Sequence, residues 1–161
     1  MNDPGPAHPR SLGAALDTLG SLENDVLKAA VLKAALDLDL FTVVAGGQHC
    51  LGEIAESTLC DMRGMQILLD ALCPLGLLAK SRRGYFLTPV SDAFLVRGKP
   101  TYCGTWMLKA GLGWEAHGRA AEGIRRGKPT MLDVTGPQAD DIWASNFAPD
   151  ILAWPDLAKE A

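Results

Sequence analysis

One stretch of the chain combines large aromatic side chains with a titratable group. Trp106, Trp114 and His117 recur at helical spacing. Tryptophan rings beside an imidazole could line a pocket for a flat organic ligand, and the same spacing is also that of an ordinary packing seam between helices. The spacing by itself favours a packing seam, with a ligand pocket lined by Trp106, Met107, Trp114 and His117 as the alternative.

Other patterns that could carry chemistry are incomplete. Residues 111–116 match Gly-x-Gly-x-x-Ala, which cradles a pyrophosphate when it joins a strand to a helix. Residues 105–110 show helical periodicity instead of a strand pattern, so the match indicates helix packing. His49, Cys50 and Cys60 lack the paired spacing of zinc ligands, and no Ser/His/Asp or Cys/His set can be assembled. We therefore assign no catalytic, cofactor-binding or metal-ligating residue.

Composition bounds the remaining possibilities. The chain has 161 residues, 48% of them hydrophobic, and a formal net charge of −4. Such a length buries a self-sufficient core, and the acidic balance argues against a general nucleic-acid binder. Apolar runs are too short for a membrane span, and residues 1–10 carry no targeting pattern, so we expect a cytoplasmic protein with no membrane partner. The four cysteines are expected to be reduced.

The most informative element is a helix predicted for residues 23–44, because its apolar side chains form two faces instead of one stripe. At 100° per residue, one face carries Leu27, Val31, Ala34 and Leu38, and the other carries Ala29, Leu32, Leu36 and Leu40. Such a helix needs two things to pack against. One is its own domain, and the second is another helix of this chain or a partner chain. We predict a dimer interface that includes Leu27, Ala29, Val31, Leu32, Leu36 and Leu40.

Local signals predict the elements that surround this helix. A short helix over residues 11–20 precedes it, and Gly46 and Gly47 end it. The elements expected next are a helix from Leu51, a turn at 58–60, a helix capped by Asp61 and stopped by Gly76 with a Schellman contact from Leu77, strands at 77–81 and 85–88 joined at 82–84, and a helix with Thr88 as cap and Pro89 at its first position. Three helices followed by a two-stranded wing is the winged-helix order.

The expected fold class is mainly α: a winged-helix-like dimerisation domain with a small two-stranded β wing and additional C-terminal helices. The domain is placed at residues 11–100, after a flexible arm at 1–10 and before a helical extension at 101–161. Within the extension, residues 102–126 are predicted as one helix whose glycines require close packing or a bend, and Gly127 closes it. Short helices are expected from residue 130 on.

A winged helix can also read DNA, so a small DNA-binding regulator is an alternative function. Arg63 and Gln66 lie early on the would-be recognition helix, and Arg82 and Arg83 lie in the wing. Residues 50–97 contain five basic and five acidic side chains, however. A local charge of zero is a poor start for binding a duplex, so we expect no nucleic-acid partner.

The order of four sequence runs resembles the N-terminal dimerisation domain of S-adenosylmethionine-dependent O-methyltransferases that act on small molecules in plants and in bacterial natural-product pathways. The runs are VLKAALDLDLF at 31–41, LGEIAE at 51–56, LLDALCPLGLL at 68–78 and YFLT at 85–88. Cys50 stands where this pattern usually has the Thr or Ser that caps the following helix. The resemblance implies a homodimer with interleaved N-terminal helices, and a contribution from residues 106–117 to closing a pocket for a small aromatic or polyketide-like substrate.

Members of that family continue into a Rossmann-like domain that holds S-adenosylmethionine and the general base, and no such loop precedes Ala161. The resemblance therefore implies that S-adenosylmethionine binds only to a full-length enzyme, and that this chain is inactive by itself. The predicted function is dimerisation and partial formation of a substrate pocket. A stand-alone small-molecule-binding protein is a further alternative to the DNA-binding regulator.

Overall fold

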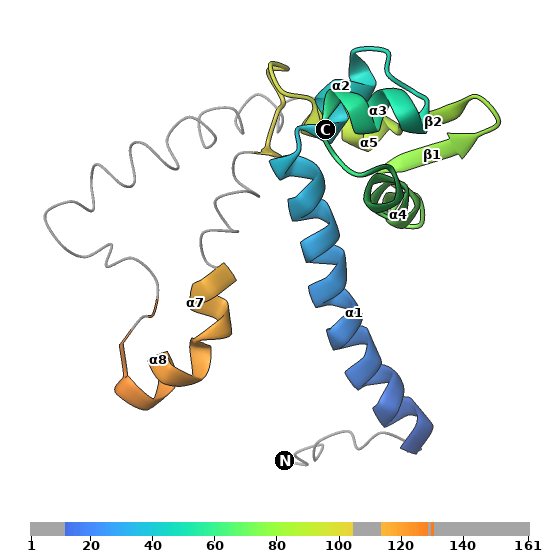
Figure 1. Ribbon diagram of the computed structural model, residues 1–161. Coiled ribbons are helices and arrows are strands. Elements are labelled where there is room, and N and C mark those ends of the chain that lie inside the picture. The colour runs from blue at the N-terminus through green and yellow to red at the C-terminus, as the bar shows by residue number, and fades with distance from the viewer. Residues whose placement is uncertain (1–11, 105–113, 129, 131–161) are drawn as a thin grey trace, which may run out of the picture.

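The computed structural model describes residues 12–104, 114–128 and 130, and the described part is mainly helical (Figure 1). The helices are α1 (Leu12–Asp37), α2 (Leu40–Ala45), α3 (Leu51–Ser57), α4 (Met62–Leu72), α5 (Pro89–Leu95), α7 (Trp114–Gly118) and α8 (Ala120–Arg126). Strands β1 (Leu78–Ser81) and β2 (Gly84–Leu87) pair antiparallel, with Leu78 opposite Leu87. The predicted mainly α fold with a two-stranded wing is confirmed. No helix among these residues is long and apolar enough to cross a membrane.

The first helix differs from the prediction at both ends. Residues 11–20 were expected to form a separate helix, but α1 runs without a break from Leu12 to Asp37. Gly20 lies inside it at a cost of about 1 kcal/mol relative to alanine, which a helix of 26 residues tolerates. The predicted helix over 23–44 was also wrong, because it is divided in two after Asp37.

Asp39 makes the corner that separates α1 from α2. Its backbone is left-handed, with φ of 50°, a conformation that aspartate adopts more readily than most residues. The side chain supports the corner, because the Thr42 hydroxyl donates a hydrogen bond to Asp39 Oδ1 over 2.8 Å. The chain can therefore turn sharply and place α2 beside the last turns of α1.

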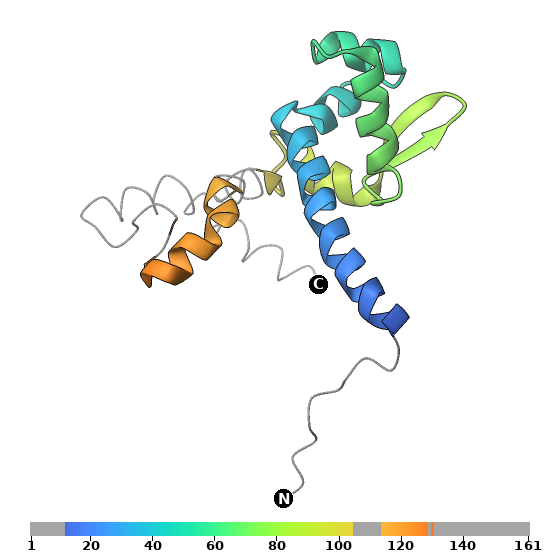
Figure 2. The same ribbon diagram turned by 60° about the horizontal axis from the view of Figure 1, so that its bottom comes forward.

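The core lies between the end of α1 and the elements that follow it, as the second view shows (Figure 2). α1 contributes only Ala35 and Leu36 as buried residues. The other buried apolar side chains are Leu40, Phe41, Val44, Ile54, Ala55, Met65, Leu69, Leu72, Leu78, Tyr85, Leu95 and Val96. We call this assembly of residues 31–103 the bundle. Its four cysteines are free thiols, of which Cys50 is exposed and Cys60, Cys73 and Cys103 are half-buried.

Several local signals in the bundle are confirmed. Asp61 caps α4 by accepting a hydrogen bond from Gly64 N over 2.9 Å. At the other end of α4, Gly76 is left-handed, and the backbone N–H of Leu77 donates to the carbonyl of Leu72 over 3.1 Å. This is the predicted Schellman motif, which turns the chain into β1.

The wing is fastened to the loop between α2 and α3. Tyr85 N donates to the carbonyl of His49 over 2.9 Å. Gly84, with φ of 120°, lies so close to His49 that a Cβ there would come within 2.2 Å of that carbonyl oxygen. Only glycine fits this position, so the contact fixes the wing against the rest of the bundle.

The predicted single helix over residues 102–126 was wrong in its second half. α7 ends at Gly118 and α8 begins at Ala120, because Arg119 between them leaves the helical conformation with φ of −100° and ψ of 12°. This is the kind of bend that the glycines suggested. Gly127 ends α8 in the left-handed conformation, as predicted. The glycine pattern at 111–116 lies largely outside the described residues, and the short helices expected after 130 lie wholly outside them.

Candidate functional site

The N-terminal half of α1 carries a row of apolar side chains that the described chain leaves uncovered. We call this row the α1 stripe. Its members and their exposed fractions are Leu12 80%, Leu16 61%, Leu19 64%, Leu22 61%, Val26 57% and Leu27 58%. Burying a leucine or valine side chain contributes about 1.5–3 kcal/mol, which this surface forgoes in a single chain. A contiguous apolar surface of this kind marks an interaction site.

The stripe lies upstream of the residues of α1 that face the core. At 100° per residue, Leu19 and Ala35 are about 160° apart around the helix axis, whereas Leu22 and Leu36 are only about 40° apart. The line of the helix that Ala35 occupies is polar further upstream, where it carries Asp17, Ser21 and Lys28. In Figure 1 the N-terminal half of α1 extends away from the bundle. The exposed and the buried apolar surfaces of α1 are therefore separated mainly along its length.

The predicted interface residues are divided between these surfaces. Leu27 and Ala29 are exposed, whereas Val31 and Leu32 are half-buried against the core. Leu36 and Leu40 are 3% and 0% exposed and belong to the core of the chain itself. Their place at a dimer interface stays a prediction that their burial argues against.

The predicted pocket residues are described only in part. Trp114 lies on α7 and is 42% exposed, and His117 lies on the same helix and is exposed. Trp106 and Met107 lie outside the described residues. A shared surface of these four side chains stays a prediction.

The segment that leaves the bundle is tied to the corner at the end of α1. The backbone N–H of Arg97 donates to the Thr42 hydroxyl over 3.0 Å, and its Nε donates to Asp39 Oδ1 over 3.3 Å. These residues are more than 50 positions apart in the chain, and sequence analysis gave no sign of the contact. The corner at Asp39 therefore both ends α1 and holds Arg97, where the chain leaves the bundle.

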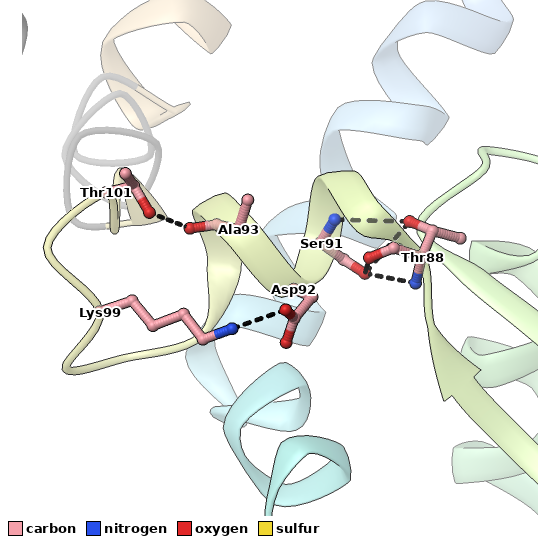
Figure 3. Close-up of polar contacts among 6 residues, drawn as sticks. All are labelled: Thr88, Ser91, Asp92, Ala93, Lys99 and Thr101. Atoms are coloured by element: carbon pink, nitrogen blue, oxygen red, sulfur yellow. Dashed lines mark hydrogen bonds and ion pairs between the residues drawn. The ribbon is translucent and has the colours of Figure 1, made fainter. Parts of the chain in front are cut away.

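The exit segment is also held against α5 (Figure 3). Lys99 Nζ lies 2.7 Å from Asp92 Oδ2, and the Thr101 hydroxyl donates to the carbonyl of Ala93. The start of α5 is fixed as predicted, because the Thr88 hydroxyl accepts a hydrogen bond from Ser91 N over 3.4 Å. The direction in which the chain leaves the bundle is thus set by contacts on both sides.

A charged cluster holds the wing against α4. Lys80 Nζ lies 2.6 Å from Asp70 Oδ1, and the Tyr85 hydroxyl donates to the same oxygen over 2.8 Å. The hydrogen bond from Lys80, followed by that from Tyr85, lowers the pKa of Asp70. The hydrogen bond to Asp70 raises the pKa of Lys80, and burial raises the pKa of Tyr85. The cluster joins one helix to two strands and has a structural role.

Cys50 does not weaken the start of α3 as much as its poor capping ability suggested. The Glu53 carboxylate accepts hydrogen bonds from Cys50 N over 3.1 Å and from His49 N over 3.3 Å. These two bonds, with the one from Cys50 the larger influence, lower the pKa of Glu53. The carboxylate thus satisfies backbone donors at this helix start.

The residues considered for metal binding have structural partners. The His49 ring stacks on Phe86 with centroids 4.4 Å apart, and its Nδ1 lies 3.1 Å from the carbonyl oxygen of Tyr85. Within the described ranges, no group of three or more His, Cys, Asp or Glu side chains could hold a metal ion.

The residues considered for DNA binding are all exposed. Arg63 and Gln66 lie on α4, and Arg82 and Arg83 lie at the tip of the wing. Met62 and Ile67, which are apolar, are also exposed on α4. This surface mixes basic, polar and apolar side chains, whereas the α1 stripe is apolar throughout.

Comparison with known proteins gives a family match over the later part of α1 and most of the bundle. Residues 21–97 match the family model of the O-methyltransferase dimerisation domain. Rat acetylserotonin O-methyltransferase is 32% identical over 131 residues, which cover 80% of this chain and 30% of that enzyme. The tetracenomycin polyketide synthesis 8-O-methyl transferase TcmO of Streptomyces glaucescens is 36% identical over 121 residues, which cover 72% of this chain and 36% of TcmO. The chain thus spans about a third of the length of these relatives.

A solved structure agrees with the sequence relatives. The crystal structure of human N-acetylserotonin methyltransferase in complex with SAM matches with a TM-score of 0.67 and 25% identity, over 76% of this chain and 36% of that one.

Proposed function

Because residues 21–97 belong to the family of O-methyltransferase dimerisation domains, we propose that this chain pairs with a second copy of itself as the assembly part of a methyltransferase. The observation that carries the proposal is the α1 stripe. Its six large apolar side chains are all more than half exposed in the single chain. A second copy would remove them from water, and hydrophobic burial is the main driving force of such association.

The division of the chain is part of the proposal. Residues 11–100 form the dimerisation domain, and residues 101–161 form the helical lead into a Rossmann-like catalytic domain. In support, Cys103 N still donates to the carbonyl of Phe94 on α5 over 2.9 Å, so the bundle closes near that boundary. The next described helices, α7 and α8, pack against each other.

The substrate side of the proposal rests on α7 and on the relatives. Trp114 and His117 lie on α7 and, with Trp106 and Met107, would form part of the wall of a substrate pocket. TcmO is named for tetracenomycin polyketide synthesis, and the rat enzyme is named for acetylserotonin. A small aromatic or polyketide-like alcohol is therefore the substrate class that we propose for the complete enzyme.

The described residues do not fit S-adenosylmethionine. A nucleotide-type cofactor site of this kind needs a strand that leads into a glycine-rich loop and a helix. Here β1 leads into the turn at Arg82 and Arg83, and β2 leads through Thr88 into α5. Neither connection within the described residues is glycine-rich, so we assign no step of methyl transfer to them.

Sedimentation equilibrium at micromolar concentration tests the pairing. We expect the unmodified chain to be a dimer, and Leu19→Glu to raise the dissociation constant by at least about 100-fold, because each copy loses a buried leucine. Leu59→Asn is the matched control, since Leu59 is 95% exposed in a left-handed turn that asparagine tolerates. A monomeric unmodified chain would contradict the proposal, as would a Leu19→Glu protein that dimerises as tightly as the control.

A further inference from the structure

The spacing within the exposed half of α1 is more specific than an apolar stripe requires. Six residues follow one another at alternating intervals of three and four: Leu12, Ala15, Leu19, Leu22, Val26 and Ala29. We call this set the α1 seam. Alternation of three and four is the heptad spacing of a left-handed coiled coil, in which side chains of one helix enter the gaps of another. The seam therefore indicates a single long helix as its partner.

We propose that the partner is α1 of a second copy, packed antiparallel along the seam. This inference rests on the proposed function and adds its geometry. Leu12 faces Ala29 of the second copy, Ala15 faces Val26, and Leu19 faces Leu22. The twofold axis passes between residues 20 and 21, and the two bundles lie at opposite ends of the paired helices.

The sizes of the seam residues favour this orientation. In the antiparallel arrangement each alanine meets a leucine or a valine, so that large and small side chains interdigitate. In a parallel, in-register pair, Ala15 would meet Ala15 and Ala29 would meet Ala29, which leaves two underfilled layers. Such gaps are costly because helix interfaces pack as densely as protein interiors.

Charge gives a second reason for the antiparallel orientation. The seam position that follows Ala29 is Lys33, whose ammonium group pairs with Asp37 of the same chain. A parallel pair would bring the Lys33 side chains of the two copies into one layer, where like charges repel. In the antiparallel pair, Lys33 lies past Leu12, the first described residue of the partner's helix, so the two Lys33 side chains are far apart.

The register follows from the residues at the two ends. Sliding the helices by one heptad toward their C-termini would pair Leu12 with Leu36, which is 3% exposed in the core of its own chain, and would bury Lys33. Sliding them the other way would leave Val26 and Ala29 uncovered. The proposed register alone uses every seam residue and no residue that the bundle already buries.

The pairing extends beyond the family match. That match begins at residue 21, whereas α1 begins at Leu12 and half of the seam lies upstream of residue 21. Leu12, Ala15 and Leu19 are therefore assigned to the interface by this structure and by their spacing.

Chemical cross-linking tests the orientation. Leu12→Cys and Ala29→Cys are made separately in a Cys50→Ser background, since Cys50 is the exposed member of the four free thiols. The two variants are co-expressed and treated with a short bis-maleimide. We expect a covalent dimer from the co-expressed pair and none from either variant alone, because like positions are about 26 Å apart in the antiparallel helix pair. The Cys50→Ser protein without an added cysteine is the control.

The outcomes separate this inference from the proposed function. Covalent dimers from each variant alone would overturn the antiparallel orientation. A protein that sediments as a dimer and gives no cross-link in the co-expressed sample would overturn the seam as the contact, and pairing itself would stand. A monomer in sedimentation would overturn both.

Discussion

The two halves of α1 use the same kinds of residue and end in opposite environments. Ala35 and Leu36 near its end are buried, whereas Leu19 and Leu22 nearer its start are more than 60% exposed. The difference lies in what the chain places beside them. The corner at Asp39 folds α2 back against the final turns, and α4 also packs there, while nothing among the described residues covers the start. Burial of a helix face is thus decided by the rest of the chain as much as by the helix.

This comparison has consequences for assembly. A helix whose apolar surface is entirely satisfied by its own domain has nothing to offer a partner. α1 buries its last turns in its own bundle and leaves the stripe near its start available. Folding and pairing can therefore use the same helix without competing for the same side chains.

The largest expected effects come from replacing one leucine by alanine in each half of α1. Leu36→Ala should lower the free energy of unfolding by about 2–5 kcal/mol at every protein concentration, because it leaves a cavity in the core. Leu19→Ala should act mainly through pairing, so its effect should shrink as the protein is diluted. Urea denaturation over a hundredfold range of concentration measures both. Equal losses for the two variants at high dilution would show that the chain itself covers Leu19.

Replacing two glycines by alanine is expected to change the free energy of unfolding by smaller amounts, and in opposite directions at the two positions. Gly84→Ala should cost about 1–3 kcal/mol of unfolding free energy, because the new Cβ meets the carbonyl of His49 and the backbone is left-handed. Gly20→Ala should add about 1 kcal/mol, since no atom lies within 4 Å of its Cβ and α1 is helical there. Thermal or urea unfolding gives both values. A destabilised Gly20→Ala protein would indicate a close neighbour on that side of α1.

The smallest expected effect concerns pH and is confined to the bundle. The pKa of Asp70 is lowered by its bond with Lys80, so the carboxylate favours the folded state at pH values above the ordinary aspartate range near 4. That contribution is lost as the pH falls through the lowered folded-state pKa. Asp70→Asn should therefore be slightly less stable at pH 7 and show a shallower loss of stability between pH 4 and pH 2. Identical acid limbs in the two urea-unfolding series would contradict this role.

Sequence reasoning succeeded where the signal is local. The cap at Asp61, the Schellman turn at Gly76 and the cap at Thr88 each depend on a few adjacent residues, and each was predicted correctly. The hairpin was also predicted within one residue at each strand end. These features follow from the conformational limits of single residue types and need no knowledge of distant contacts.

The incorrect predictions concern features that depend on contacts between residues far apart in the chain. Gly20 was read as a helix boundary, although nothing in the chain forces a break there. The corner at Asp39 was missed because an aspartate in the left-handed conformation gives no distinctive pattern, and its bond to Arg97 joins residues far apart in the chain. Periodicity also could not tell which apolar face of α1 the bundle would take, so the predicted interface set included Leu36 and Leu40, which the core of the chain buries.

The corner at Asp39 has a mechanical consequence. α1 is about 39 Å long, and only its C-terminal end is buried in the bundle. A small sideways force near Leu12 is multiplied over that length into a large torque at the corner, where Arg97 is attached. Pairing of the N-terminal half of α1 with a second copy would therefore fix the direction in which each chain continues after the bundle.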